Sequence, residues 1–390
     1  MAKLNGGLPD FGMVFKEKAA VAVSGAVRGV LGVLIPDDTS DKIKTVCLSS
    51  LDIKQDEWTE DNLLFIKSLA FLGNPFKVIL YRVKIDLSNL QEVLKTVEKD
   101  EPNYFSIPII PVVAKAKSGS TLKTDVESWL NNLRNEEGIK LGKEVSTIKL
   151  VTSCDVEPNK PYIIDYSSKQ THHVVAGLEN KVLTAQEYSL CVASLCAGVP
   201  LNASITNMNQ PWLKSFKSSV ANEDEEIAKG KVLTGYDGER YTILRGVTSF
   251  TEATDDKNVS FTKIRKMEIM DIHQKDIRNT FKSSYRGRYQ NTYDNKRLLL
   301  GAINSYLSTF KKNGQLNPSY DNKMVIDLEA HRKFLLEKGT YKGKAITEED
   351  IKKMSDYELA RIDTDDKVFA YIPQYKPTDV MEDFYGEAIM

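Results

Sequence analysis

Residues 21–35 read VAVSGAVRGVLGVLI and are followed by Pro36-Asp37-Asp38. Valine and glycine dominate this run, which is typical of a buried strand that other backbone approaches closely. The proline and the two aspartates predict the end of the strand. The run therefore predicts a strand inside a sheet, and the segments after it indicate what kind of sheet that is.

Helix-like and strand-like segments alternate after this run. Apolar residues recur at helical spacing in some of them and fill short continuous runs in others. In chain order the helices are expected over residues 58–72, 87–97 and 122–133, and the strands over 76–83, 148–152 and 162–166. Such a rhythm indicates an α/β layer with at least some parallel strand pairing.

Three further segments complete this part of the chain. Residues 104–113 are apolar but contain Pro108 and Pro111, so we predict an edge strand there. Residues 188–201 are mostly apolar but shorter than the roughly 20 residues of a membrane span, which predicts a buried core helix. Residues 231–244 flank Asp237-Gly238 with two β-rich runs, which predicts a hairpin because glycine supplies the positive φ of the turn.

The last third changes character after a polar linker at residues 251–258. Helical stripes, a capping box at Thr347 and a late strand at residues 367–372 predict an α+β unit. The fold class is therefore α/β (α+β) and multidomain. The expected parts are an N-terminal arm over 1–20, an α/β layered middle domain over 21–250, a C-terminal α+β domain over 255–365, and a C-terminal strand and arm over 366–390.

Composition excludes several classes of protein. A length of 390 residues suggests two or three domains. Lys and Arg number 53 and Asp and Glu 54, a balance that argues against a nucleic-acid binder driven by bulk positive charge. Four cysteines are too few for a disulfide scaffold, so we expect buried thiols. Glycines, a proline and an aspartate interrupt residues 1–15, so we expect no secretion signal and synthesis in the cytoplasm.

Catalytic and cofactor motifs do not stand out in the sequence. It contains no GxGxxG after a strand, no Walker A loop, no HExxH and no GxSxG, so we expect no cofactor, no metal and no catalytic residues. Asp165, Ser167 and either His172 or His173 could be arranged as a hydrolase triad. A cytoplasmic α/β hydrolase-like enzyme therefore stays open as an alternative.

Basic residues cluster between Lys263 and Arg297, with tyrosines and a phenylalanine among them. The cluster has three interpretations: a nucleic-acid surface, a solvated helix face, or a patch for an acidic protein partner. We favour the acidic protein partner, and a nucleic-acid-binding protein is the second alternative. The basic residues are Lys263, Arg265, Lys266, Lys275, Arg278, Lys282, Arg286, Arg288, Lys296 and Arg297.

Several short segments, taken in order and spacing, resemble the contractile-tail sheath proteins of bacteriophages and of phage-tail-like bacteriocins. The segments are Arg245–Phe250, Lys263–Arg265, Asp271–Phe281, Asn291–Lys296 and Ala302–Tyr306. Residues 367–384 resemble the terminal strand pair of that family. Residues 7–19 with Arg28-Gly29 resemble the short Gram-positive type of sheath subunit.

The resemblance implies a structural protein and not an enzyme. Subunits of this family form stacked hexameric rings around a rigid tail tube and contract to drive the tube through the envelope of the target cell. The implied partners are further copies of the chain, the tail tube protein, and baseplate and tail terminator proteins, with no nucleic acid and no direct membrane insertion. The implied location is a virion tail or phage-tail-like particle, assembled in the cytoplasm of the host bacterium.

The resemblance also assigns roles to residues. Neighbouring subunits of the family are linked by strand exchange of their terminal arms. The arm residues expected to take part are Leu8, Phe11, Val14, Phe15, Lys367, Val368, Phe369, Val380, Met381 and Phe384. The C-terminal domain of the family lies innermost and touches the tube, so the candidate tube contacts are Arg278, Lys282, Arg286 and Arg288.

Overall fold

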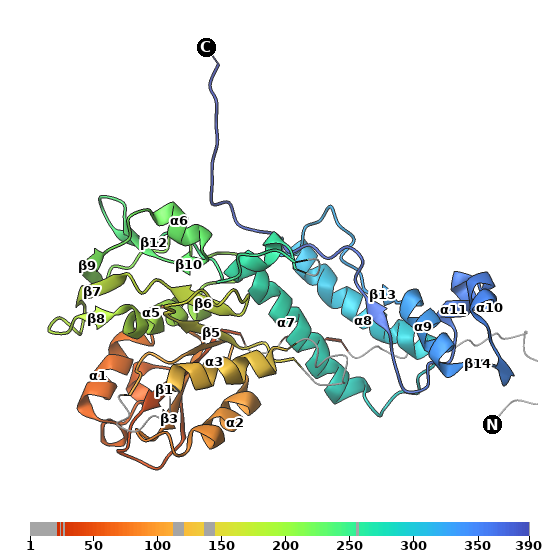
Figure 1. The fold of residues 1–390 in the computed structure, drawn as a ribbon, viewed down its shortest axis with the longest axis horizontal. Coiled ribbons are helices and arrows are strands. Elements are labelled where there is room, and N and C mark those ends of the chain that lie inside the picture. The colour runs from red at the N-terminus through yellow and green to blue at the C-terminus, as the bar shows by residue number, and fades with distance from the viewer. Residues whose placement is uncertain are drawn as a thin grey trace, which may run out of the picture. The chain divides into compact units, whose positions relative to one another are not determined.

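A computed structural model describes residues 22–23, 25, 28–111, 121–135, 145–254 and 257–389 (Figure 1). The chain divides into two compact bodies. The α/β body contains Gly25–Arg278, Phe310–Tyr320 and Lys376–Met390. The helical body contains Asn279–Thr309 and Asp321–Tyr375. Each body is described by itself below.

A seven-stranded sheet forms the centre of the α/β body. Its strand order is β10-β6-β5-β4-β1-β3-β2, and every neighbouring pair is parallel except β2 with β3. The strands are β1 (Val30–Pro36), β2 (Lys44–Cys47), β3 (Lys77–Val83), β4 (Tyr104–Ser106), β5 (Lys149–Thr152), β6 (Ile163–Tyr166) and β10 (Lys231–Val232). The predicted α/β layer with parallel pairing is confirmed.

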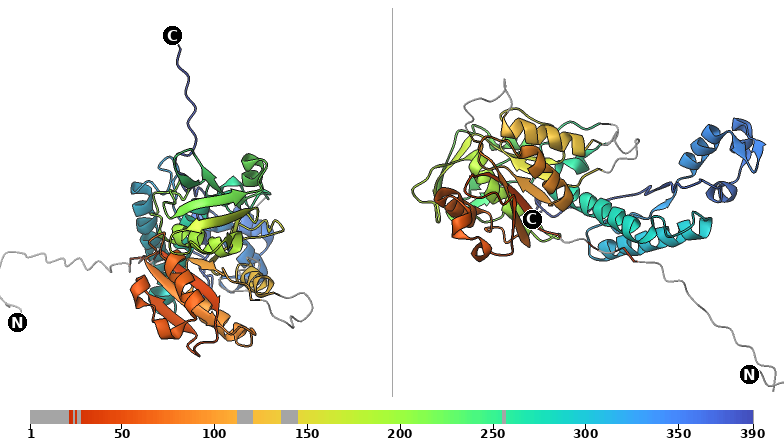
Figure 2. Two further views of the ribbon diagram at one scale, coloured as in Figure 1. Left: turned by 90° about the vertical axis from the view of Figure 1, so that its left-hand side faces the viewer. Right: turned by 90° about the horizontal axis from the view of Figure 1, so that it is seen from below.

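Helices cover both faces of this sheet, and Figure 2 gives two further views of the layers. Alternate residues of β1 point to opposite faces, as the two-residue period of a strand requires. Leu31 and Val33 pack with α1 (Glu60–Leu69) and α5 (Ala185–Gly198). Val30 and Leu34 pack with α2 (Leu90–Asp100) and α3 (Leu122–Leu133). Burial on both faces explains the continuous apolar run at β1.

The prediction of an edge strand at residues 104–113 is wrong. β4 lies between β1 and β5 in the interior of the sheet and is only three residues long. Pro108 and Pro111 follow the three paired residues, so they remove no donor from the ladder. The prediction of a buried core helix is confirmed by α5, and no helix in the described part of the chain is long and apolar enough to cross a bilayer.

Smaller elements surround the main sheet of the α/β body. The predicted hairpin is confirmed, with Gly238 at φ 102° in its turn. A second sheet has the strand order β8-β7-β9. The strands are β7 (Gln170–Val175), β8 (Leu183–Thr184), β9 (Leu213–Ser218), β11 (Thr234–Tyr236) and β12 (Tyr241–Ile243). The helices are α6 (Glu223–Ala228) and the 3-10 turns η1 (Ser50–Asp52), η2 (Gln55–Glu57) and η3 (Val259–Thr262).

The helical body has a small core of its own. Its buried residues include Phe334, Leu335, Ile351 and Leu359. The helix over Leu328–Lys338 ends at Gly339 (φ 65°), and the predicted capping box at Thr347 is present. The elements are the π turn η4 (Phe281–Tyr285), α8 (Tyr293–Lys312), α9 (Leu328–Lys338), α10 (Glu348–Lys353), α11 (Asp356–Ala360), and strands β13 (Val325–Ile326), β14 (Thr340–Tyr341), β15 (Lys344–Ala345) and β16 (Ala370–Tyr371).

The two bodies divide after Arg278. Most of helix α7 (Ile264–Thr280) belongs to the α/β body, up to Arg278. The physical reason is a set of buried charges on α7 that pair with residues of the α/β sheet and its connections. The sequence shows these charges only as the polar residues of a helix.

Candidate functional site

The C-terminal segment of residues 376–383 lies against the α/β body. Main-chain hydrogen bonds begin the contact: the Asn317 amide donates to the Lys376 carbonyl (2.9 Å) and the Thr378 amide donates to the Gln315 carbonyl (3.0 Å). The guanidinium of Arg265 donates to the Thr378 carbonyl. Hydrogen bonds to the backbone therefore hold the first residues of this segment, and its acidic side chains add further contacts.

Three basic side chains, here termed the C-terminal clamp, then hold the acidic residues of this segment: Arg245, Lys263 and Lys266. The Glu382 carboxylate lies 2.5 Å from Lys263 Nζ and 3.5 Å from Arg245 Nε. Arg245 also pairs with Asp383, and this hydrogen bond raises the pKa of its guanidinium. Lys266 Nζ lies 3.1 Å from Asp379. These ion pairs between the clamp and the acidic residues hold the segment in place up to Asp383.

The last residues of the chain run away from the α/β body (Figure 1). We term residues 384–389 the tail. The side chains of Phe384, Tyr385 and Ile389 are 94%, 92% and 90% exposed. Apolar side chains this exposed on a terminal segment are typical of a site that another chain covers.

The other end of the chain enters the α/β body beside α7. Arg28 Nε pairs with Glu268 on α7 (2.9 Å), and Arg28 Nη2 donates to the Val199 carbonyl (2.6 Å). The Tyr104 hydroxyl donates to the second oxygen of Glu268 (3.1 Å). Burial raises the pKa of Glu268, and Arg28 opposes that rise. The candidate arm residues Leu8, Phe11, Val14 and Phe15 lie outside the described residues.

Helix α7 is itself anchored to the α/β body by buried ion pairs. Asp271 accepts hydrogen bonds from Arg134 Nη1 and Lys149 Nζ, both at 2.8 Å. All three residues are at most 7% exposed. Two turns further along the helix, Arg278 pairs with Glu101 (2.5 Å). We term the segments that lead into the two terminal arms the arm roots. Both arm roots contact α7: Arg265 and Lys266 hold the C-terminal segment, and Glu268 holds the N-terminal one.

The candidate arm residues at 367–369 take part in the fold of their own chain. Phe369 packs on the core of the helical body, with its ring centroid 5.9 Å from that of Phe334. Its carbonyl accepts a hydrogen bond from the Asp327 amide (3.1 Å). The strand predicted at residues 367–372 is only the two residues of β16, which pairs antiparallel with β13. The described chain end thus contains a folded part, a clamped part and the exposed tail.

The basic cluster of residues 263–297 is divided among several contacts. Arg278 pairs with Glu101 and donates to the Val145 carbonyl, so its charge is used inside the α/β body. Lys296 is buried and donates to the Thr364 hydroxyl (2.7 Å). Lys282, Arg286 and Arg288 are exposed. The continuous basic surface that a nucleic-acid interface needs is therefore interrupted by internal pairs.

Three of the four residues considered for a hydrolase triad lie in the core, and the side chain of the fourth, His173, lies outside the described ones. Asp165, Ser167 and His172 are at most 1% exposed. The His172 Nε2 atom hydrogen-bonds with the Tyr166 hydroxyl (2.8 Å), and the Asp165 carboxylate pairs with Lys231 (3.2 Å). A substrate has no access to these groups, so they give the enzyme alternative no support.

The roles of Arg245, Lys263 and Lys266 in the clamp were not predicted. In the sequence, Lys263 and Lys266 belong to the basic cluster, and Arg245 belongs to one of the segments that carry the family resemblance. The signal in the sequence is the acidic set Asp379, Glu382 and Asp383 in an otherwise apolar terminus. A run of this kind predicts an electrostatic partner, but 138 residues separate Arg245 from Asp383, so local spacing does not identify it.

Replacing Arg245 with glutamate (Arg245→Glu) is expected to release the C-terminal segment without unfolding the chain. Partly exposed ion pairs contribute about 0–1 kcal/mol each, so the free energy of unfolding should change little. Amide hydrogen exchange of residues 379–383 should accelerate, while that of β1 stays unchanged. The charge-swapped variant Arg245→Asp with Asp383→Arg should restore slow exchange. Unchanged exchange in Arg245→Glu would show that the backbone contacts alone hold the segment.

Comparison with known proteins finds similarity to tail sheath proteins. Residues 256–390 match the phage tail sheath C-terminal domain. The chain is 28% identical over 386 residues to the tail sheath protein of Clostridium phage phiCD119, covering 97% of this chain and 98% of that one.

Two solved structures show the same fold at low sequence identity. The sheath tail protein of Desulfitobacterium hafniense matches with a TM-score of 0.59 and 14% identity, covering 82% of this chain and 94% of that one. The helical sheath of the anti-feeding prophage in its contracted state matches with a TM-score of 0.58 and 14% identity, covering 98% of this chain and 100% of that one. The resemblance and the fold class inferred from sequence are confirmed.

Proposed function

We propose that this chain, a tail sheath protein by its C-terminal domain and by its fold, polymerises as stacked hexameric rings around a tail tube. Terminal arms link the subunits by strand exchange, and contraction of the sheath drives the tube through the envelope of the target cell. Its partners are further copies of itself, the tail tube protein, and baseplate and tail terminator proteins. It works in a virion tail or phage-tail-like particle assembled in the host cytoplasm.

The convergence of both arm roots on α7 is the observation that carries this proposal. Arg28 binds Glu268 of α7, and Lys266 of the same helix binds Asp379. The helix is fixed to the sheet through Asp271, whose two cationic partners are buried. A pull on either arm is therefore transmitted through one helix to one sheet, which suits a subunit that stays linked to its neighbours while it moves.

The small sheet of the helical body supports the strand-exchange part of the proposal. β13 and β16 pair over only two residues each, so an added strand would extend a very short ladder. A strand of six residues adds about 4–6 hydrogen bonds at roughly 0.5–1.5 kcal/mol each, or about 2–9 kcal/mol before ordering costs. One such link is weak to moderate, and several links in a closed ring add avidity. Leu8, Phe11, Val14 and Phe15 of one arm and Phe384 of the other are the proposed exchanged residues. Val380 and Met381 lie between the acidic residues that the clamp holds on their own chain.

The tube contact is proposed for the exposed basic residues of the helical body, Lys282, Arg286 and Arg288. Arg278 is the weakest of the four original candidates because Glu101 already neutralises it. Exposed ion pairs are weak, so they can align the subunit on the tube without binding it tightly. This suits a surface that must release the tube on firing.

Reversing two of these charges together (Lys282→Glu with Arg288→Glu) should impair assembly on the tube more than polymerisation of the sheath by itself. Raised salt should weaken the tube contact of the unmodified chain similarly, because salt screens exposed charges. Sedimentation with purified tubes measures the effect. The matched control is Lys352→Glu with Lys353→Glu, on side chains that are 70% and 74% exposed on α10. Normal coating of tubes by the Lys282/Arg288 variant at low salt would place the contact on another face.

Co-expression of the chain with its tube protein, followed by negative-stain electron microscopy, tests the function itself. Regular tubes wider than the bare tube are the expected result. A chain that stays monomeric beside bare tubes would contradict the proposal.

A further inference from the structure

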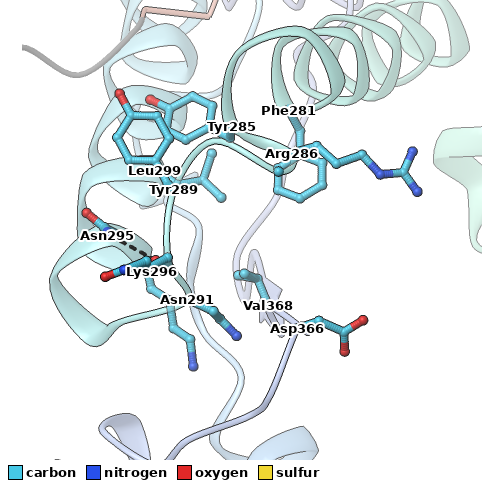
Figure 3. Close-up of a pocket in the computed structure, with 12 residues that line it drawn as sticks. Phe281, Tyr285, Arg286, Tyr289, Asn291, Asn295, Lys296, Leu299, Asp366 and Val368 are labelled. Carbon is cyan, nitrogen blue, oxygen red and sulfur yellow. Dashed lines mark hydrogen bonds between the residues drawn. The ribbon is translucent and has the colours of Figure 1, made fainter.

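A pocket of about 340 Å³ lies in the helical body beside the start of α8 (Figure 3). Its walls are the turn and loop after α7, the first turns of α8, and the chain that leads into β16. Tyr285 and Tyr289 form one wall, and Val368 and Asp366 lie across from them. Leu299 of α8 adds apolar surface. A volume of this size suits one or two side chains of a partner.

The walls of this pocket are fixed before any partner arrives. The Tyr285 and Tyr289 rings stack with centroids 5.1 Å apart. The Asn295 side chain donates to the Gln290 carbonyl (2.8 Å), which joins the loop to α8. The Asn291 side chain donates to the Lys367 carbonyl (2.9 Å), which joins the loop to the chain before β16. A preformed pocket costs little ordering when it is filled.

The tail has the complementary chemistry. Phe384 and Tyr385 are more than 90% exposed, and burying one such side chain changes a binding constant by roughly 10- to 100-fold. The tail contains one acidic residue, Glu387, and no basic one. The loop of the pocket supplies exposed Arg286 and Arg288, against the single acidic lining residue Asp366.

We propose that this pocket receives the tail of a second copy of the chain, with an aromatic ring of Phe384 or Tyr385 against Tyr285 and Tyr289 and with Glu387 facing Arg286. The inference rests on the proposed function, since it assigns a side-chain anchor to the arm that links subunits. Val368 of the pocket lies two residues before β16, so a tail that adds a strand to the small sheet brings its side chains to the pocket. Backbone hydrogen bonds to the sheet then supply affinity, and the pocket fixes which residues of the tail lie opposite which residues of the sheet.

Disulfide trapping in assembled sheath tests this proposal. The native cysteines are buried, so an engineered surface pair reacts alone. One chain carries Gln290→Cys at the pocket and another carries Tyr385→Cys in the tail. Their mixture should give a cross-linked dimer with a yield at least about 10-fold above that of a mixture with the exposed control Lys353→Cys, because docking raises the local thiol concentration. Adding Phe384→Ser to the tail variant should lower the yield by about 10-fold.

The possible outcomes separate the pocket from the function. Normal sheath without a cross-link to residue 290, or with equal cross-linking to residue 353, overturns the pocket assignment and leaves the sheath function standing. A cross-link from Phe11→Cys instead of Tyr385→Cys assigns the pocket to the N-terminal arm and also overturns it. Unmodified chains that form no sheath with tube protein contradict the proposed function, and the pocket assignment with it.

Discussion

Deleting residues 384–390 is expected to leave a folded chain that forms no sheath. The side chains of Phe384, Tyr385 and Ile389 are at least 90% exposed, so the fold loses almost no packing when they are removed. Assembly loses the segment proposed to join subunits, and a ring without these links has no avidity. Circular dichroism and the midpoint of thermal unfolding should match those of the full chain, while electron microscopy with tube protein should show bare tubes. Deleting residues 2–18 should give the same result.

Two controls sharpen this deletion. Replacing residues 384–390 with glycine and serine at the same length should also abolish assembly, which separates the side chains from the length of the chain. Leu51→Ser changes another apolar side chain, 90% exposed, in a 3-10 turn of the α/β body. It should assemble normally. If the truncated chain still forms sheath of normal length, the strand-exchange role proposed for the C-terminal end is wrong.

Asp271→Ala is expected to give the largest loss of stability. The change leaves Arg134 and Lys149 buried without their shared carboxylate, with side chains that are 5% and 1% exposed. Removing one partner of a buried ion pair costs about 3–5 kcal/mol, because the remaining charge is uncompensated. Urea denaturation measures the free energy of unfolding. The variant should also assemble poorly, since α7 carries both arm roots.

Glu348→Ala is the matched control for Asp271→Ala. It also removes an acidic partner of a lysine on a helix, but the Lys352 and Glu348 side chains are 70% and 64% exposed. The expected change is within about 0.5 kcal/mol. An equal loss from both variants would show that the charges under α7 contribute no more than surface pairs do.

Local patterns in the sequence account for most of the α/β body. The period of the apolar residues predicts α2 and α3, and the continuous apolar runs predict α5, β1 and β3. The position of β4 inside the sheet could not be predicted in this way. Strand order depends on pairing between segments far apart in the chain, and the two prolines that suggested an edge lie beyond the paired residues.

The charged residues of the candidate site were the least predictable part. Asp271 and Glu268 are ordinary polar residues of a helix in the sequence, and only the sheet beneath α7 shows that they are buried. The basic residues form one cluster in the sequence, yet Lys266 pairs with Asp379 and Arg278 pairs with Glu101, which lies far from the cluster in the chain. Charge pairs over such separations leave no local pattern, which is why the sequence indicated the chemistry but not the partners.

The most direct test of the account is a map of the assembled particle at side-chain resolution. The account predicts that residues 376–383 of each subunit stay on the Arg245, Lys263 and Lys266 clamp of their own chain, while residues 384–389 lie on the helical body of a neighbouring subunit. Tails that lie wholly on their own subunit, with no arm passing between copies, would contradict it.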